Sequence, residues 1–141
     1  LVRGASERLF ALSGGRYRMA SDANGFRVVD LDHAGEKRST DTLSGGETFL
    51  ASLAMALELS DQIRAKAGRV DLDCIFIDEG FGTLDPETLE TVAEAVEGLQ
   101  RPGRLVGIIT HVAELAQRMP ELLPIDKAQA GSSVRLTTAT G

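Results

Sequence analysis

Two short apolar runs separated by one amphipathic helix constrain the fold more than any other feature of this sequence. The runs are DCIFID at residues 73–78 and LVGIIT at residues 105–110. Both have the length and composition of strands that are buried on both faces of a sheet. Strand, helix and strand in this order predict two parallel strands with helices packed on the sheet, which is an α/β fold.

Hydrophobic spacing predicts a long helix from Ser44 to about Lys66, stopped by Gly68, and a second helix after the N-cap Asp85 and Pro86. The two apolar stripes comprise Phe49, Leu50, Leu53, Ala54 and Leu57 in the first helix and Leu89, Val92, Ala93, Val96 and Leu99 in the second. The other expected elements are a helix end at 1–12, strands at 16–20 and 26–32 joined by a turn, a polar loop or edge strand at 33–41, a short helix ending near Pro120, and closing strands at 122–129 and 132–138 that can form a hairpin.

The composition fits one globular domain. With 141 residues, of which 43% are hydrophobic, the chain can bury a core and is too apolar for disorder. Its apolar runs are too short to span a bilayer, and its start lacks the pattern of a signal peptide. The single cysteine, Cys74, excludes an internal disulfide framework and fits a reducing cytosol. Leu1 is not an initiator methionine, so we expect a piece of a longer chain.

The charge is unevenly spread along the sequence. The net charge of −6 argues against a surface coated with nucleic-acid-binding residues. Residues 1–40 nevertheless carry seven Lys and Arg against five Asp and Glu, a balance of +2, whereas the remainder carries a balance of −8. A basic N-terminal part is compatible with contact to a polyanion. It is equally compatible with a solvated surface on which the charges are scattered without function. On charge alone, the DNA-binding candidates are Arg16, Arg18, Arg27, Lys37 and Arg38.

The tetrapeptide LSGG occurs twice, first at residues 12–15 and again at the start of the long helix. The first copy closes a helix, where glycine accepts the left-handed conformation, so we expect a structural turn. The second copy opens a helix, and Ser44 and Glu47 there fit a capping box. The cap does not explain Gly45 and Gly46, because glycine within a helix costs about 1 kcal/mol against alanine. A group that closely approaches the backbone explains them better, and the free N–H groups and helix dipole favour an anion.

Two adjacent carboxylates, Asp78 and Glu79, follow the first apolar strand. At the C-terminal edge of a parallel sheet an Asp suits Mg²⁺, and the adjacent Glu can orient or deprotonate a water that attacks a phosphoryl group. An exposed acidic turn is the simpler alternative, but two neighbouring carboxylates repel each other unless a cation or proton intervenes. His111 follows the second strand at the corresponding edge, from which it could reach the same phosphate.

The segments LSGGE, CIFIDEGFGTLD and GIITH occur in the order and approximate spacing of an ABC-type ATPase. They resemble its signature motif, its Walker B strand with the D-loop, and its H-loop. The form DEGFGTLD is most similar to the SMC-related branch, and within it to the C-terminal half of the SbcC family, whose Arg-Tyr segment matches Arg16-Tyr17. The resemblance covers most of the chain and is strongest from Thr42 to Glu114.

One departure from the family pattern concerns the phosphate-binding loop. The 141 residues contain no G-x-x-x-x-G-K-[ST] segment. In the SbcC family this P-loop belongs to an N-terminal lobe, which a long antiparallel coiled coil separates from the C-terminal lobe. The chain therefore resembles the C-terminal lobe alone, and we expect it to lack ATPase activity without the other lobe.

The resemblance implies a lobe of an ABC-type ATPase head with a parallel central sheet, flanking helices and short antiparallel strands at both ends. Within residues 1–141 it implies the end of a coiled-coil helix at 1–14, strands at 15–41, the signature, Walker B, D-loop and H-loop core at 42–119, and closing strands at 120–141.

The resemblance also implies roles at ATP sites that two heads share, with ATP and Mg²⁺ as cofactors. The signature residues Ser44, Gly45, Gly46 and Glu47 would contact, in trans, the ATP held by the other head. The remaining implied roles are Mg²⁺ support by Asp78, positioning of the attacking water by Glu79, sensing of the γ-phosphate by His111 and contact across the dimer interface by Asp85.

The implied partners are the N-terminal P-loop lobe, a second head in a homodimer, an SbcD-like nuclease and double-stranded DNA, with no membrane. The implied setting is DNA repair and recombination by a cytoplasmic, nucleoid-associated protein. Two alternatives share part of the pattern. An SMC-type clamp that tethers DNA shares every motif, and a transporter ATPase is disfavoured by DEGFGTLD and by Arg16-Tyr17.

Overall fold

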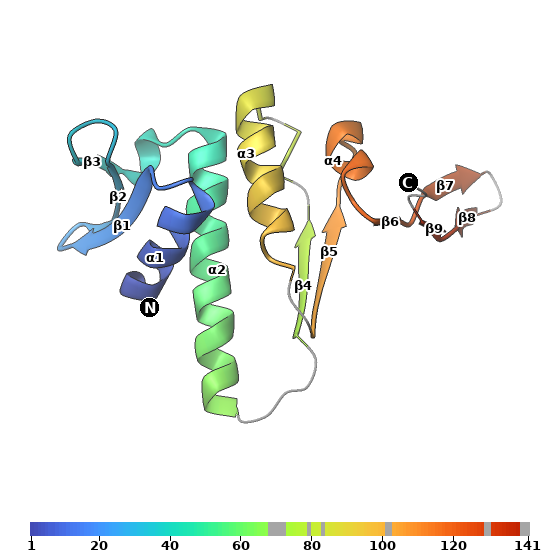
Figure 1. Cartoon of the computed structure of the whole chain (residues 1–141), viewed down its shortest axis with the longest axis horizontal. Helices are drawn as coiled ribbons and strands as arrows, with labels where there is room; N and C mark the ends of the chain where they lie inside the picture. Colours follow the sequence, from blue (N-terminus) through green and yellow to red (C-terminus); the bar gives the residue numbers. More distant parts are fainter. Residues whose placement is uncertain (68–72, 79, 83, 101–102, 129–130, 139–141) are drawn as a thin grey trace.

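The computed structural model in Figure 1 describes residues 1–67, 73–78, 80–82, 84–100, 103–128 and 131–138. Its elements are helix α1 (Val2–Leu12), strands β1 (Tyr17–Asp22), β2 (Gly25–Asp30) and β3 (Glu36–Ser39), a 3-10 turn (Thr40–Thr42), helix α2 (Gly45–Ala67), strand β4 (Asp73–Asp78), helix α3 (Pro86–Glu97), strand β5 (Arg104–Ile109), helix α4 (Ala113–Gln117), and strands β6 (Glu121–Leu122), β7 (Ile125–Ala128), β8 (Gly131–Val134) and β9 (Thr137–Thr138).

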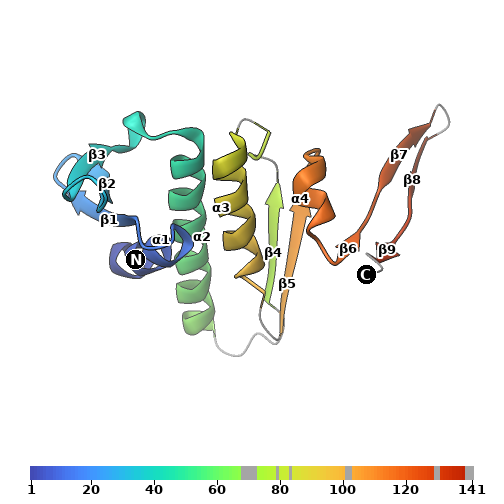
Figure 2. The ribbon, with the colours of Figure 1, turned by 45° about the horizontal axis from the view of Figure 1, so that its top comes forward.

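The two strands predicted from the apolar runs are parallel neighbours, as expected. β4 and β5 pair in register from Asp73 with Arg104 to Asp78 with Ile109. In both Figure 1 and Figure 2, α2 and α3 lie between this sheet and the antiparallel strands β1–β3. The predicted α/β architecture, with a parallel sheet, flanking helices and antiparallel strands toward both ends of the chain, is confirmed.

The prediction that β4 and β5 are buried on both faces is wrong for this chain. On one face, Ile75, Ile77 and Val106 pack against the core. On the other face, Phe76 is 68% exposed and Leu105 is 55% exposed. The sequence made both faces apolar, but the helices α2 and α3 cover only one of them, so the sheet presents an uncovered apolar face to solvent.

The helix α2 runs through the centre of the molecule, and its predicted apolar face is confirmed. Leu50, Leu53, Ala54 and Leu57 are all buried. They meet apolar side chains of the helices on either side, because α1 packs on one flank of α2 and α3 on the other. The main core comprises Ala5, Leu9, Tyr17, Met19, Val28, Leu50, Ala51, Ala54, Phe81, Val92, Ala93, Ala95, Val96 and Leu115.

The antiparallel sheet β1–β2–β3 settles the alternative left open for residues 33–41, since β3 is an edge strand. Its register places Arg18, Val29 and Lys37 in one row across the three strands. These side chains lie on the outer face, whereas Tyr17, Met19 and Val28 point into the core. Side chains of alternate residues on a strand point to opposite faces, so the register determines which Arg and Lys share a surface.

The C-terminal segments form the expected hairpin. β7 and β8 pair antiparallel from Ile125 with Val134 to Ala128 with Gly131, and β6 pairs with β9. In both views the hairpin projects from the body of the molecule (Figures 1 and 2). Within the described parts of the chain, no helix combines the length and apolar character needed to cross a membrane.

The first LSGG copy is a structural turn, as predicted. Gly14 and Gly15 have φ angles of 60° and 92°, in the left-handed region that glycine favours. The N–H of Gly15 donates to the carbonyl oxygen of Phe10 at 2.8 Å, and Ser13 Oγ accepts from the N–H of Tyr17 at 2.9 Å. These bonds end α1 and direct the chain into β1.

Candidate functional site

The second LSGG copy forms the predicted capping box at the start of α2. The N–H of Glu47 donates to Ser44 Oγ at 3.3 Å, and the N–H of Ser44 donates to Glu47 Oε2 at 2.8 Å. Because Ser44 Oγ serves here as an acceptor, its hydroxyl hydrogen remains able to donate to a further group. Ser44 and Gly45 are exposed. The N–H groups of the first helical turn lack intrahelical acceptors, so this surface can bind an anion.

Glu47 makes two further contacts that the sequence did not reveal. Its Oε1 accepts from Tyr17 Oη at 2.7 Å and from Arg38 Nη1 at 2.8 Å. Burial alone would raise the pKa of Glu47, but its hydrogen bonds with Ser44, Tyr17 and Arg38 outweigh burial and hold the pKa below its usual range. Burial and the bond to Glu47 raise the pKa of Tyr17 well above its ordinary value. Glu47 is therefore an ionised carboxylate that joins β1, β3 and α2.

Gly46 is explained by packing between α2 and α3. The residue is buried, and a Cβ added there would lie 1.9 Å from Cγ2 of Thr88. Thr88 is itself held by Asp85, whose Oδ1 accepts from the Thr88 N–H at 3.0 Å and whose Oδ2 accepts from the Thr88 hydroxyl at 2.6 Å. Close approach of another group does require glycine at position 46, but that group is a side chain of the same chain. A phosphate contact by the Gly46 N–H stays a prediction.

Gly46→Ala is expected to lower the free energy of unfolding by about 1–2 kcal/mol. Overpacking costs about 1–3 kcal/mol, and the higher helix propensity of alanine offsets less than about 1 kcal/mol of it. The double variant Gly46→Ala/Thr88→Ser removes the methyl group that the new Cβ would meet and keeps the hydroxyl bonded to Asp85, so it should recover most of the loss. Urea unfolding of the three proteins measures this, and a Gly46→Ala protein as stable as wild type would contradict the packing argument.

Asp85 is the N-cap of α3 with Pro86 at the first turn, as predicted. The pKa of Asp85 lies below its usual range because the Thr88 side chain and backbone N–H both donate to its carboxylate. The cap accounts for Asp85 structurally. Its proposed place at a dimer interface stays a prediction.

The residues after β4 and β5 converge as the sequence predicted. Asp78 is the exposed last residue of β4, beside Ile109 of β5, and His111 follows two residues later. A Cβ added to Gly82 would lie 2.8 Å from His111 Nε2, so the imidazole lies directly against the loop that leaves β4. Glu79, the predicted catalytic carboxylate, lies outside the described residues, as does Thr83.

The same loop also contacts the start of α2. A Cβ added to Gly80, whose φ is 98°, would lie 3.4 Å from the ring of Phe49, and the rings of Phe49 and Phe81 have centroids 5.0 Å apart. The beginnings of α2 and α3 and the ends of β4 and β5 therefore meet at one end of the molecule (Figure 1). Sequence reasoning placed His111 at the same sheet edge as Asp78, but it did not bring the starts of α2 and α3 to that edge or identify Phe49 and Phe81 as the link.

The described residues fit a Mg²⁺ ion only if the phosphates of a nucleotide supply further ligands. Over the residues that the structure describes, no group of three or more His, Cys, Asp or Glu could hold a metal ion. Mg²⁺ is usually held by one or two carboxylates together with substrate phosphates, rather than by a cage of protein ligands. The exposed carboxylate of Asp78 at the strand end suits that role.

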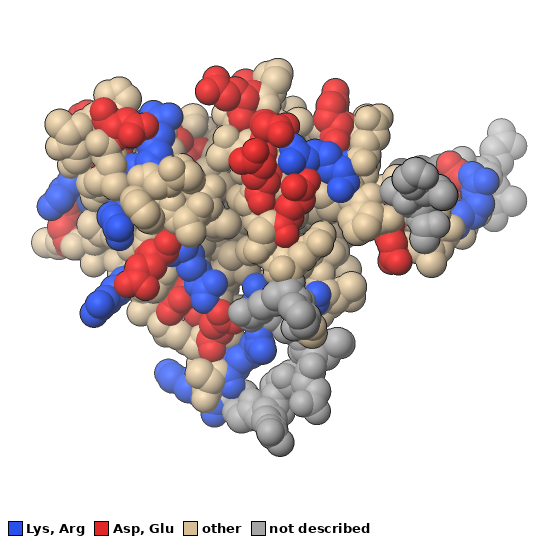
Figure 3. Space-filling model, viewed as in Figure 1, with Lys and Arg blue, Asp and Glu red and all other residues tan. Residues whose placement is uncertain are grey.

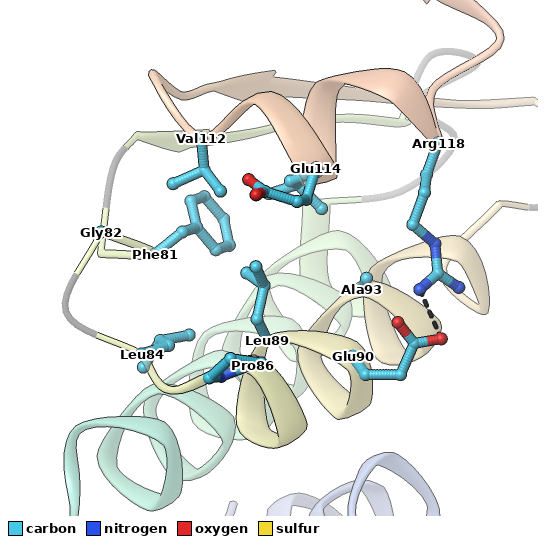
Figure 4. A pocket seen from close by; sticks show the side chains of 11 residues that line it. Phe81, Gly82, Leu84, Pro86, Leu89, Glu90, Ala93, Val112, Glu114 and Arg118 are labelled. Atoms are coloured by element: carbon cyan, nitrogen blue, oxygen red, sulfur yellow. Dashed lines mark ion pairs between the residues drawn. The ribbon is translucent and has the colours of Figure 1, made fainter.

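An apolar hollow of about 370 Å³, which the sequence did not predict, opens beside this end of the molecule (Figure 4). Phe81, Leu89 and Val112 line it, from the loop after β4, α3 and the start of α4. Arg118 lies at its rim and forms an ion pair with Glu90 at 2.7 Å. In the sequence these apolar positions were indistinguishable from ordinary core positions.

The five DNA-binding candidates separate into two groups. Arg16 bonds to the buried carboxylate of Asp30 at 3.1 Å, and Arg38 bonds to Glu47, so both have structural partners. Three candidates share the outer face of the β1–β3 sheet: Arg18, which stacks on Phe10, Arg27, which pairs with Asp22, and Lys37, which is exposed. In the view of Figure 3 basic and acidic side chains are interspersed, and acidic ones gather over α3.

Comparison with known proteins places these observations in a family. Residues 22–98 match the family model described as SbcC/RAD50-like, Walker B motif. The chain is 52% identical over 134 residues to the SbcC subunit of the SbcCD nuclease of Deinococcus radiodurans, covering 95% of this chain and 14% of that protein. It is 45% identical over 136 residues to the SbcC subunit of the same nuclease in Staphylococcus saprophyticus, covering 92% and 14%. The chain thus spans about one seventh of the length of these relatives.

Solved structures share the fold at low sequence identity. One solved structure comes from a study of ATP-driven dimerization and DNA-stimulated activation of SMC ATPases. It superposes with a TM-score of 0.70 at 17% identity, and the match covers 97% of this chain and 83% of that chain. The SMC head domain from Thermotoga maritima gives a TM-score of 0.68 at 16% identity, covering 98% and 47%. With the head fold matched along nearly the whole chain and the family model along more than half of it, the chain belongs to the SbcC/RAD50-like family.

Proposed function

We propose that this chain is the C-terminal half of an ATP-hydrolysing head in an SbcC-like DNA repair and recombination protein. One observation carries the proposal. The start of α2, with the Ser44 capping box, lies at the same end of the molecule as the ends of β4 and β5, where Asp78 lies and where His111 packs against the loop 80–82, yet the sequence has no P-loop to hold a phosphate. The chain therefore supplies groups that can contact the phosphates and the Mg²⁺ of a nucleotide. A second lobe must supply the P-loop that binds those phosphates.

The uncovered apolar face of β4 and β5 supports docking of an N-terminal P-loop lobe. Phe76, Leu105 and Ile109 are each more than half exposed on that face. A sheet flanked by helices on both faces buries such side chains, and each full burial contributes about 1.5–3 kcal/mol. Asp78 is the last residue of β4, so a lobe docked on this face would bring its bound phosphates near the carboxylate.

The proposed chemistry divides the ATP site between two heads. Bound Mg²⁺, supported by Asp78, would neutralise charge on the phosphates. Glu79 would orient the attacking water, and His111 would contact the γ-phosphate of the nucleotide in the same head. Ser44, with the N–H groups of Gly45 and Gly46, would donate to the γ-phosphate held by the other head, where donors aimed at developing charge stabilise the transition state.

We infer the partners from those relatives that have the higher sequence identity to this chain. Relatives that are 52% and 45% identical are subunits of the nuclease SbcCD, whereas the SMC heads share only 16–19% identity with this chain. This difference favours control of an SbcD-like nuclease on double-stranded DNA ends over an SMC-type clamp. If DNA contacts this lobe, Arg18 and Lys37 on the outer face are the exposed candidates, since Arg27 pairs with Asp22 and its side chain is only 19% exposed.

The purified 141-residue chain is expected to show negligible ATP hydrolysis, and adding the N-terminal P-loop lobe should restore it. The reason is the missing cradle for the phosphates, without which proximity and charge stabilisation are both lost. ATP turnover is measured for each lobe alone and for the mixture of both lobes. A second mixture, in which the P-loop lysine of the N-terminal lobe is replaced, is the control. Robust turnover by this chain alone would overturn the proposal.

A further inference from the structure

The loop that carries Ser44 is bound on two sides by one cluster of side chains, which we call the Glu47 cluster (Tyr17, Arg38 and Glu47). Resting on the proposed function, we propose that Arg38 is a positioning residue for the phosphate-binding loop rather than a DNA contact. It holds Ser44 in place and neutralises Glu47, so that a phosphate of the opposite head can approach. The proposal gives a role to a residue that charge alone assigned to DNA.

The geometry of Arg38 supports positioning first. Its Nη1 donates to Glu47 Oε1 at 2.8 Å, and its Nη2 donates to the carbonyl oxygen of Thr42. Thr42 and Glu47 flank Ser44 on either side, so a single guanidinium spans the loop. Arginine presents several donors in one rigid plane, which a lysine ammonium does not reproduce. Arg38 therefore fixes the distance between the two ends of the loop.

The second support is the place of the cluster in the fold. Arg38 lies on the edge strand β3, in register with Val28 of β2, and points to the inner side of the sheet. Its side chain is only 26% exposed, and that of Glu47 is 13% exposed. Tyr17 of β1 is buried and donates to the same carboxylate oxygen. Both outer strands of the sheet thus bind the loop, and the guanidinium is not presented on the outer face with Arg18 and Lys37.

Charge gives the third support. The carboxylate of Glu47 accepts from the N–H of Ser44 at 2.8 Å, so a negative charge lies one hydrogen bond from the surface proposed to receive a phosphate. Arg38 pairs with that charge at 2.8 Å in a half-buried setting, where ion pairs are screened less than at the surface. Without Arg38, the carboxylate would repel the incoming phosphate and would no longer hold the loop from the side of β3.

The test uses the full-length protein and measures head association driven by a non-hydrolysable ATP analogue. Arg38→Gln should weaken association about ten- to a hundredfold, as expected for loss of a partly buried, charge-assisted contact. Nucleotide binding by single heads should change less than about twofold, because the P-loop lies in the other lobe. Arg38→Lys, which keeps the charge but not the bridge to Thr42, should fall between. Lys66→Gln removes the same charge from the exposed far end of α2 and should associate as wild type does.

A double variant distinguishes loss of the charge that neutralises Glu47 from a general loss of folded structure. In Arg38→Gln/Glu47→Gln both charges are absent, so association should recover in part relative to Arg38→Gln, which mere loss of structure would not allow. Thermal unfolding identifies any variant that fails to fold, and Arg38→Lys then provides the comparison. If wild-type heads do not associate with nucleotide, the proposed function itself fails. If wild type associates and Arg38→Gln does so equally well, or if Arg38→Gln alters only the salt dependence of DNA binding, Arg38 is not a positioning residue.

Discussion

Ser44→Arg in the full-length protein is expected to abolish ATP-dependent association of two heads, weakening it by more than about a hundredfold. Ser44 is exposed at the first turn of α2, where we propose that the γ-phosphate of the opposite head binds. An arginine side chain there fills the space that the phosphate would occupy. It also removes the cap in which Ser44 Oγ accepts from the Glu47 N–H, which costs about 0.5–2 kcal/mol of stability without unfolding the protein.

Ser44→Ala is the matched control for this effect. It loses the same cap and the same hydroxyl donor but leaves the space open, so association should weaken only about tenfold. Both variants should bind nucleotide as single heads with wild-type affinity. Gel filtration with a non-hydrolysable analogue separates dimer from monomer, and a Ser44→Arg protein that still forms the dimer would remove Ser44 from the interface.

The sequence predicted the elements because each local signal agrees with the packing. The spacing of Leu50, Leu53, Ala54 and Leu57 predicts one apolar face, and that face is buried in the structure. Asp85 and Pro86 predict the start of α3, and Asp85 does cap it. Such signals depend on residues a few positions apart, which is why they can be read without the fold.

The exposure of β4 and β5 could not be predicted in the same way. An apolar run such as DCIFID indicates which side chains avoid water in the finished protein, whichever chain segment covers them. In the structure, Phe76 and Leu105 face solvent because α2 and α3 lie on the opposite side of the sheet. Burial of these side chains would require the P-loop lobe that we propose to dock on this face, and nothing in the run itself indicates which segment covers it.

At the candidate site, too, contacts between residues near in sequence were predictable and contacts between distant residues were not. The capping box of Ser44 and Glu47 joins residues three positions apart and was predicted, whereas the bond from Tyr17 to Glu47 joins residues 30 positions apart. That contact depends on how the β1–β3 sheet packs on α2, for which the sequence has no local signal. Charge alone makes Arg38 a DNA-binding candidate, because charge is visible in a sequence, whereas its partner Glu47 is visible only in the structure. The sequence likewise gives no sign that Thr88 of α3 approaches Gly46, which explains this glycine by packing and leaves the phosphate contact a prediction.

We propose that Ser44 acts on a nucleotide held by another molecule. Two inactive variants of the full-length protein test it when mixed: Ser44→Arg, and a variant whose P-loop lysine in the N-terminal lobe is replaced. In a mixed dimer, the intact P-loop of the first variant faces the intact Ser44 of the second. The introduced arginine faces the disabled P-loop, which holds no phosphate to obstruct.

The measurement is ATP turnover of the equimolar mixture against each variant alone. If Ser44 acts in trans, every mixed dimer has one complete site of two, so the mixture should regain about one quarter of the wild-type turnover if the heads pair at random and about one half if only mixed dimers form. If Ser44 serves the nucleotide of its own head, neither head in the mixed dimer has a complete site. A mixture no more active than its two components would show that Ser44 does not act in trans.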